Sequence, residues 1–292
     1  MESNWLRIEA CAKINLALDI HHKRNDGYHE VAMVMQAVAL ADLVGLQEQA
    51  EGISVATNLA GLDSGPSNLA YRAAALVLAT CGIRRGVHIE LEKRIPLAAG
   101  LAGGSSDAAA VLTGLNRMWR LGLSPAELDN LGATLGSDVP FCLHGGTMLA
   151  TGRGEILTRL PDVPHAWVVL AKLPVEVSTA WAYNNYRPEA VAAHPDISGM
   201  TACLKQQDLA GVAARLGNVL ETVTIPAHPE ISALKQCMLD TGAMACLMSG
   251  SGPTVFGLTA ERREAENVAD SLRRRTRAQV MVTETLAVVG GE

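Results

Sequence analysis

The N-terminal part of the chain shows the two-residue alternation of strands that bury one face. Across residues 5–20 every even-numbered position is apolar or small, which predicts a strand. An Asp-Gly turn signal lies within residues 25–30, and the apolar run at 31–40 predicts a second strand. Residues 42–47 and 53–58 predict two further strands, which their short connections favour as antiparallel neighbours.

Helical spacing follows over residues 69–80, where Asn68 is a candidate N-cap and Gly82 lies just beyond the predicted end. Alternation then predicts a strand at 87–93. After a glycine-rich stretch, apolar residues recur at i, i+3, i+4 and i+7 from Ala108, which is typical of an amphipathic helix. A strand, a glycine-rich segment and a helix are therefore expected in direct succession.

A further helix and a hairpin complete this half of the chain. Ser124–Glu127 has the form of a capping box with proline at the first helical position, and the helix is expected to end near Gly136. Residues 146–151 and 155–160 predict the two strands of a hairpin, joined by a glycine-containing turn.

The order of elements changes after the proline-containing segment 160–165. We therefore expect one domain at residues 1–160 and a second at 161–292, the second opening with a strand at 166–172. The later predicted elements are a helix at 229–239, strands at 243–248 and 254–258, a helix at 261–274 and a strand at 279–286. This βα…αββαβ order predicts a ferredoxin-like domain.

Composition narrows the class of protein. The 292 residues are 49% hydrophobic and 18% charged, which fits a globular chain with a substantial core. A net charge of -6 argues against a nucleic-acid partner. Six scattered cysteines form no C-x-x-C pair, which fits reduced cytosolic thiols. With no signal-peptide pattern and no apolar stretch of about 20 residues, we expect a cytoplasmic protein without a membrane partner.

The glycine-rich stretch PLAAGLAGGSSDAAA, residues 96–110, has the setting of an anion site. Backbone N–H groups converge on an anion where a strand leads through such a loop into a helix. We expect Gly100, Gly103 and Gly104 to permit positive φ and a close approach. The loop lacks the lysine of a P-loop and the G-x-G-x-x-G order of a dinucleotide site. A linker or a closely packed turn remains an alternative.

Four side chains are candidates for chemistry beside this loop. Lys13 and Asn15 share the strand face opposite the apolar row, where a lysine needs an anionic partner, unless it lies at a solvated edge. Asp138 follows a helix end and is either an N-cap or a carboxylate that orients a hydroxyl. Tyr28, beside His29, is either folded onto the core or able to stack on a base.

Two remaining features point to the same region. Asp107, at the predicted start of the helix, is expected to face Mg²⁺ or a neighbouring amide. Residues 248–257 form a second Gly/Ser-rich turn between strands, which is either a tight turn or a loop that lines the substrate pocket.

Three motifs together resemble the GHMP small-molecule kinases, a family that includes galactokinase, homoserine kinase and mevalonate kinase. They are AKINL at 12–16, the stretch at 96–110 and SGSGPTVFG at 249–257, in family order across nearly the whole chain. The segments NDGYHEV at 25–31 and LGSDVPFCLHGGTMLATGRGE at 135–155 narrow the resemblance to a branch acting on a cytidine diphosphate substrate.

The resemblance implies an α+β, two-domain fold, with an N-terminal α/β domain (ribosomal protein S5 domain 2-like) and a ferredoxin-like C-terminal domain. It implies phosphorylation of a substrate hydroxyl with ATP and Mg²⁺. No cluster of residues has metal-ligand spacing, so we expect no metal site built by the protein alone, and we expect a monomer or weak homodimer. Another acceptor, such as homoserine, a sugar or mevalonate, and a nucleotide-binding module without turnover are the alternatives.

Residue roles follow from the same resemblance. Lys13 and Asp138 match the catalytic pair, and Asn15, Tyr28, His29 and, more loosely, Thr179 match substrate contacts. The residues matching the ATP-phosphate loop are Pro96, Leu97, Ala98, Ala99, Gly100, Leu101, Ala102, Gly103, Gly104, Ser105 and Ser106. The chain departs from the family at Cys11, where proline is usual, and at Ala99 and Ala102, where glycines are common.

Overall fold

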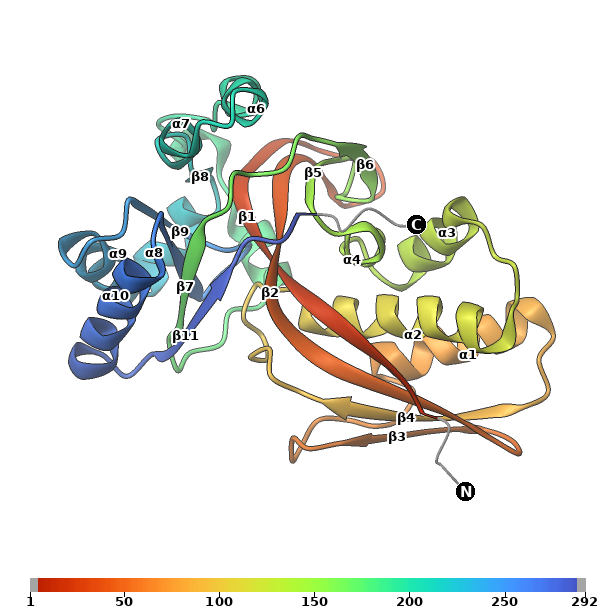
Figure 1. Ribbon diagram of the computed structural model, residues 1–292. Coiled ribbons are helices and arrows are strands. Elements are labelled where there is room, and N and C mark those ends of the chain that lie inside the picture. The colour runs from red at the N-terminus through yellow and green to blue at the C-terminus, as the bar shows by residue number, and fades with distance from the viewer. Residues whose placement is uncertain (1–4, 288–292) are drawn as a thin grey trace. The chain divides into compact units, whose positions relative to one another are not determined.

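The structure is a computed structural model that describes residues 5–287 (Figure 1). The described chain divides into two compact units, each assembled from segments that are distant in sequence. The first unit comprises residues up to 12, 40–95 and 102–144, and the second comprises the remaining described residues. The strands β1 (Leu6–Lys23) and β2 (His29–Gln49) contribute to both. The domain boundary expected after residue 160 stays a prediction.

In the first unit, helices cover one face of a mixed sheet (Figure 1). Two expectations for this sheet are wrong. Residues 42–47 are not a separate strand, because β2 runs through them without a break. The strand β3 (Ile53–Thr57) is also not an antiparallel neighbour of residues 42–47. It pairs in parallel with β4 (Gly86–Glu92), which lies between it and β2 in the sheet. Helix α1 (Leu69–Cys81) lies between β3 and β4 in sequence, so it provides the long crossover that parallel neighbours require.

Local capping signals place the helix ends as expected. The Asn68 side chain accepts a hydrogen bond from Ala70 N at the start of α1, and Gly82 ends that helix with φ 63°. Helix α3 (Pro125–Leu135) begins with the complete capping box of Ser124 and Glu127. Because capping depends on residues a few positions apart, these boundaries could be predicted from sequence.

Helix α2 (Gly103–Trp119) is held close to the sheet by a glycine. A Cβ on Gly114 would lie 2.3 Å from Leu46 Cδ1 and 2.6 Å from Ile8 Cδ1. Ala108, Val111, Leu112 and Leu115 are buried on the same helix, as its periodicity predicts. This packing fixes α2, and with it the helix N-terminus that follows the glycine-rich loop.

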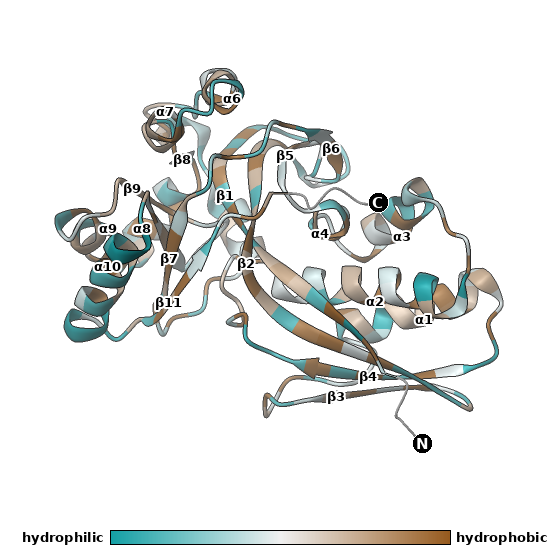
Figure 2. Ribbon diagram, in the orientation of Figure 1, coloured by the Kyte–Doolittle hydropathy of each residue, from teal (hydrophilic) through white to brown (hydrophobic). Residues whose placement is uncertain are grey.

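The second unit contains the expected ferredoxin-like sheet. Its strands lie in the order β11-β7-β10-β9, and β7 pairs antiparallel with both β10 and β11. The strands are β7 (Trp167–Lys172), β9 (Ala245–Met248), β10 (Thr254–Thr259) and β11 (Gln279–Glu284). Helix α10 (Arg262–Arg275) is mostly hydrophilic in Figure 2. Its apolar residues Ala265, Val268, Ala269 and Leu272 are buried, as predicted.

The second unit also holds a hairpin and several shorter elements. The hairpin of β5 (Thr147–Thr151) and β6 (Ile156–Arg159) was predicted, and β5 also pairs with β2. The two-residue strand β8 (Gly217–Asn218) pairs in parallel with β1. The helices are α5 (Thr179–Asn185), a 3₁₀ turn (Pro188–Ala190), α6 (Ile197–Lys205), α7 (Leu209–Ala213), α8 (Glu221–Ala227) and α9 (Glu230–Asp240). Among residues 5–287, no helix has the length and apolar character that crossing a membrane requires.

Candidate active site

The glycine-rich loop joins β4 to α2, so the predicted succession of strand, loop and helix is confirmed. The prediction of which residues adopt positive φ is only partly right. Gly100 has φ +72°, but Gly103 and Gly104 already belong to the helix, and the other positive values fall on Ala98 at 48° and Ala102 at 59°. Two of the three positive-φ residues of the loop are therefore alanines, and the second, Ala102, directly precedes the helix.

Two of the three glycines, Gly100 and Gly103, are also explained by what their α-carbons approach. A Cβ on Gly100 would lie 2.2 Å from Ser249 O. On Gly103 it would lie 3.0 Å from Ile95 Cγ2. These approaches leave no room for a side chain at position 100 and little at position 103, so close packing accounts for both glycines.

Lys13 and Asn15 lie side by side on β1 and are buried, with exposures of 4% and 0%. Lys13 Nζ donates to Asn15 Oδ1 at 2.7 Å and to Gly100 O at 3.1 Å. Lys13 N also donates to Leu101 O at 3.1 Å. The structure therefore joins the predicted lysine, the predicted asparagine and the glycine-rich loop in one network, and the solvated-edge alternative for Lys13 is excluded.

The first turn of α2 adjoins the segment that carries Asp138. Ser105 Oγ lies 4.0 Å from the position of a Cβ on Gly136, two residues before Asp138. Ser106 Oγ donates to Cys11 O at 2.7 Å and contacts Cys142 Sγ at 3.3 Å. Half-buried Asp138 directly precedes helix α4 (Val139–His144), and its carbonyl accepts from Cys142 N. The segment that carries Asp138 therefore adjoins the first turn of α2.

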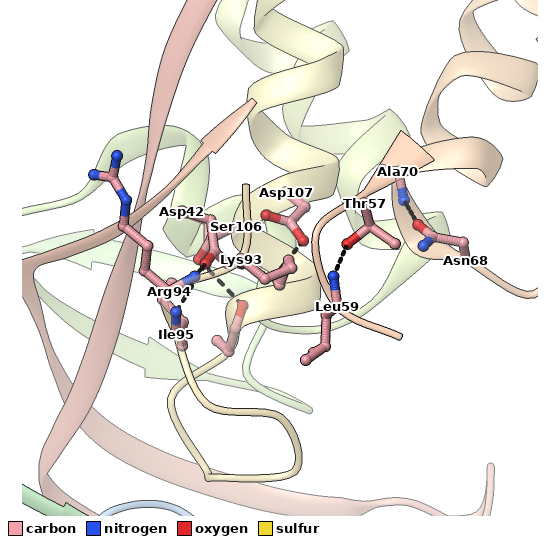
Figure 3. Close-up of polar contacts among 12 residues, drawn as sticks. Asp42, Thr57, Leu59, Asn68, Ala70, Lys93, Arg94, Ile95, Ser106 and Asp107 are labelled. Carbon is pink, nitrogen blue, oxygen red and sulfur yellow. Dashed lines mark hydrogen bonds and ion pairs between the residues drawn. The ribbon is translucent and has the colours of Figure 1, made fainter. Parts of the chain in front are cut away.

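A buried charge cluster, which sequence patterns did not predict, holds the two ends of the loop. Lys93 Nζ pairs with Asp42 Oδ2 and, at 2.5 Å, with Asp107 Oδ2 (Figure 3). Asp42 Oδ1 accepts from the backbone N–H groups of Arg94 and Ile95, at the start of the loop. Asp107 Oδ2 therefore faces a lysine ammonium rather than a neighbouring amide, and the Mg²⁺ alternative stays a prediction.

Asp107 has an unusual environment within this cluster. Its Oδ1 is buried and, among residues 5–287, has no hydrogen-bond donor. Burial raises the pKa of Asp107 from 3.8 to about 7, a shift that Lys93 opposes and Asp42 reinforces. Removal of the carboxylate from water, with a second carboxylate beside it, accounts for the direction of this shift.

Tyr28 and His29 lie at the end of the β1–β2 connection. The Tyr28 side chain is 54% exposed, and the Arg153 guanidinium lies 4.9 Å from its ring centroid. The His29 ring lies 5.6 Å from that of Tyr183, and burial, together with the charge of Lys23, lowers the pKa of His29. Tyr28 is therefore not folded onto the core, and one of its faces is occupied by a cation.

Thr179, the first residue of α5, borders the second Gly/Ser-rich loop. Its Oγ1 lies 3.1 Å from Ser251 Oγ. In the same loop, Ser249 Oγ donates to Gly100 O at 3.0 Å, the carbonyl that Lys13 also contacts. The second loop therefore packs against the first, rather than serving only as a turn between strands.

Metal-binding capacity is limited. In the part of the chain that the structure describes, no group of three or more His, Cys, Asp and Glu residues could hold a metal ion. Mg²⁺ is nevertheless commonly held by one or two carboxylates together with substrate phosphates. The absence of such a group among the described residues is therefore compatible with magnesium brought by a nucleotide.

Comparison with known proteins bears on both parts of the chain. The family model of the GHMP kinases N-terminal domain matches residues 68–146, and that of the GHMP kinases C-terminal domain matches 200–278. A 4-diphosphocytidyl-2-C-methyl-D-erythritol kinase of Geobacillus kaustophilus (strain HTA426) is 52% identical over 271 residues, covering 92% of this chain and 93% of the relative.

Solved structures show the same fold. A crystal structure of 4-(cytidine 5'-diphospho)-2C-methyl-D-erythritol kinase matches with a TM-score of 0.83 and 35% identity, over 97% of this chain and 100% of that one. A homoserine kinase from Cytophaga hutchinsonii matches with a TM-score of 0.77 and 21% identity, over 98% of this chain and 96% of the other. The second likeness concerns the fold alone.

Proposed function

Because the chain belongs to the GHMP kinase family, we propose that it phosphorylates the 2-hydroxyl of 4-diphosphocytidyl-2-C-methyl-D-erythritol with ATP. The products are the 2-phosphate and ADP, and the reaction is a step of the non-mevalonate route to isoprenoid precursors. The observation that carries this proposal is the 52% identity, across 92% of the chain, to a relative of that name.

The phosphate-binding part of the proposed site is the loop Pro96–Ala102 with the first turn of α2. Backbone N–H groups at the start of α2 provide donors and a favourable dipole for the phosphates of ATP. Magnesium, when bound with ATP, offsets phosphate charge. Ser105, half-buried in that first turn, is the residue that would contribute a hydroxyl oxygen to such a magnesium ion.

Lys13 and Asp138 are the proposed catalytic pair. The substrate oxygen forms a bond to the γ-phosphorus, the bond from that phosphorus to the bridging oxygen breaks, and ADP leaves. Asp138 orients the hydroxyl and accepts its proton, while the Lys13 ammonium offsets the charge that develops on the transferred group. The contacts of Lys13 with Asn15 and Gly100 hold that ammonium in place before substrate arrives.

Asn15, Tyr28, His29 and Thr179 are the proposed contacts of the cytidine-bearing substrate. The exposed Tyr28 ring offers a face for stacking on the base, and His29 offers ring nitrogens for hydrogen bonds. We further propose that the protein works in the cytoplasm as a monomer or weak homodimer. Its proposed modules are residues 1–160, with the phosphate loop, and 161–292. Neither nucleic acid nor membrane is a proposed partner.

A panel of acceptors tests the proposed reaction. The purified protein is incubated with labelled ATP, Mg²⁺ and, separately, 4-diphosphocytidyl-2-C-methyl-D-erythritol, homoserine, mevalonate and galactose. We expect label transfer only to the cytidine compound. Preferential transfer to another acceptor would reassign the substrate, and ATP binding without transfer to any acceptor would favour a non-catalytic role.

Matched variants test the proposed catalytic pair. K13A and D138N should each lower kcat at least about 100-fold, as expected for an acid–base or charge-stabilising group. K205A and D270N change exposed residues of α6 and α10 in the same way and should leave kcat unchanged. Near-normal turnover by folded K13A or D138N would remove that residue from the catalytic pair.

A further inference from the structure

The second Gly/Ser-rich loop, residues 249–253, is buried along its whole length. It joins β9 to β10, and buried loops are uncommon because their peptide groups cannot reach water. A buried carbonyl without a donor is destabilising, so other parts of the protein must supply hydrogen bonds to this loop.

Asn218 supplies two of these bonds. Its Nδ2 donates to Met248 O and to Gly250 O, each at 2.8 Å. Its Oδ1 accepts from Leu220 N at 2.9 Å, which fixes the orientation of the amide. Asn218 is 7% exposed and lies in β8, which pairs with β1 at Leu18. One side chain therefore spans the two carbonyls that flank Ser249.

Two residues at three-residue spacing after Asn218 assist it. Glu221 Oε1 accepts from Met248 N at 2.9 Å, and Thr224 Oγ1 donates to Ser251 O at 3.2 Å. Both lie on α8, where residues three apart share a face. The pattern N-x-x-E-x-x-T at 218–224 thus places three polar side chains on one short segment of backbone.

The other side of the same loop reaches the proposed catalytic lysine. Ser249 Oγ and Lys13 Nζ both donate to Gly100 O, at 3.0 and 3.1 Å. A Cβ on Gly250 would lie 3.5 Å from Lys13 Nζ and 3.6 Å from Asn15 Oδ1. A displacement of the loop would therefore move both the acceptor and the surroundings of the Lys13 ammonium.

We propose that Asn218 is a positioning residue for phosphoryl transfer. By fixing the carbonyls of Met248 and Gly250, it sets the place of Ser249 against Gly100 and so the direction of the Lys13 ammonium. The proposal rests on the proposed kinase function, in which Lys13 stabilises the transferred group.

The sharpest variant is N218D, which keeps the size and the acceptor of Asn218 but loses its two donors. The new carboxylate faces two carbonyl oxygens, and this repulsion displaces the loop. A misplacement of about 1 Å can reduce turnover by about 100-fold, so we expect kcat to fall about 10- to 100-fold. KM for both substrates should change less than about 3-fold, because the altered interaction belongs to the transition state.

N116D is the matched control. Asn116 Nδ2 donates to Leu123 O at 3.0 Å, and its Oδ1 accepts from Leu123 N at 3.0 Å, in the turn between α2 and α3. The same substitution there removes the same kind of bond from a different turn. We expect N116D to lower the melting temperature without lowering kcat.

A double-mutant cycle links Asn218 to the loop. S249A removes the hydrogen bond from Ser249 to Gly100 O. Because N218D is proposed to act through the same bond, the two effects should not multiply. The fall of kcat in the double variant should be far smaller than the product of the two single-variant falls. All assays run below the melting temperature of each variant. Wild-type transfer to the cytidine compound tests the proposed function separately.

Three results would overturn the role of Asn218. They are a folded N218D whose kcat is within about 2-fold of wild type, an equal fall of kcat in N116D, and independent effects in the cycle. If N218D yields no folded protein, N218S takes its place, because its shorter side chain leaves at least one carbonyl without a donor. The same three criteria then apply to N218S.

Discussion

The buried cluster of Asp42, Lys93 and Asp107 should make the stability of the protein depend on pH near neutrality. Burial raises the pKa of Asp107 to about 7, against 3.8 for an ordinary aspartate. Because the folded pKa lies above the unfolded value, protonation favours the folded state. This contribution to stability is complete below pH 3.8 and is lost as pH rises through about 7.

The size of the effect follows from that shift. One pKa unit corresponds to about 1.4 kcal/mol of differential stability. Between pH 5 and pH 8 the unfolded side chain is almost fully ionised, whereas the folded one releases its proton near the upper end of that range. The free energy of unfolding of the wild type should therefore fall by about 2 to 3 kcal/mol relative to D107N, which has no proton to lose.

Urea unfolding of both proteins at several pH values between 5 and 8 measures this difference directly. E127Q is the control, since hydrogen bonds from Ser124 lower the pKa of Glu127. The stabilising contribution of Glu127 is thus present above its ordinary pKa and is lost only at more acidic pH. A wild-type to D107N difference that stays constant within about 0.5 kcal/mol from pH 5 to 8 would refute the raised pKa of Asp107.

Two further variants test the loop and the base site. Y28A should raise KM for the cytidine substrate about 5- to 150-fold and leave KM for ATP nearly unchanged, because stacking on an aromatic ring is worth about 1–3 kcal/mol per base. Equal changes in both KM values, measured by steady-state kinetics, would remove Tyr28 from the base site. A102G should change the free energy of unfolding, measured in urea, by less than about 1 kcal/mol. Glycine relieves the strain of the positive φ at position 102, and this gain offsets the greater freedom of the unfolded chain. A larger loss of stability would show that the Ala102 methyl group contributes to packing.

Local sequence signals were sufficient for the elements that carry the site. The caps at Asn68 and Ser124 and the succession of strand, loop and helix around residues 96–110 are all formed as predicted. Each of these features depends on side chains only a few positions apart, so it can be predicted from one sequence without the structure. The same holds for the alternation that places Lys13 and Asn15 together on β1.

Pairing and burial depended on distant residues and were decided by the tertiary structure. Ser249 reaches Gly100 across 149 positions, and Lys93 meets Asp42 across 51, so neither contact leaves a local pattern. The parallel pairing of β3 with β4 was missed, although α1 lies between them as a crossover helix.

Sequence by itself determined the elements, the family motifs and the candidate residues, because periodicity and capping are short-range. Only the tertiary structure decided that Ala98 and Ala102 adopt positive φ, that Gly100 is required by the approach of Ser249, and that Asp107 lies beside Lys93. These features arise where chain segments that are far apart in sequence are packed against each other, and the space left between them fixes conformation and charge.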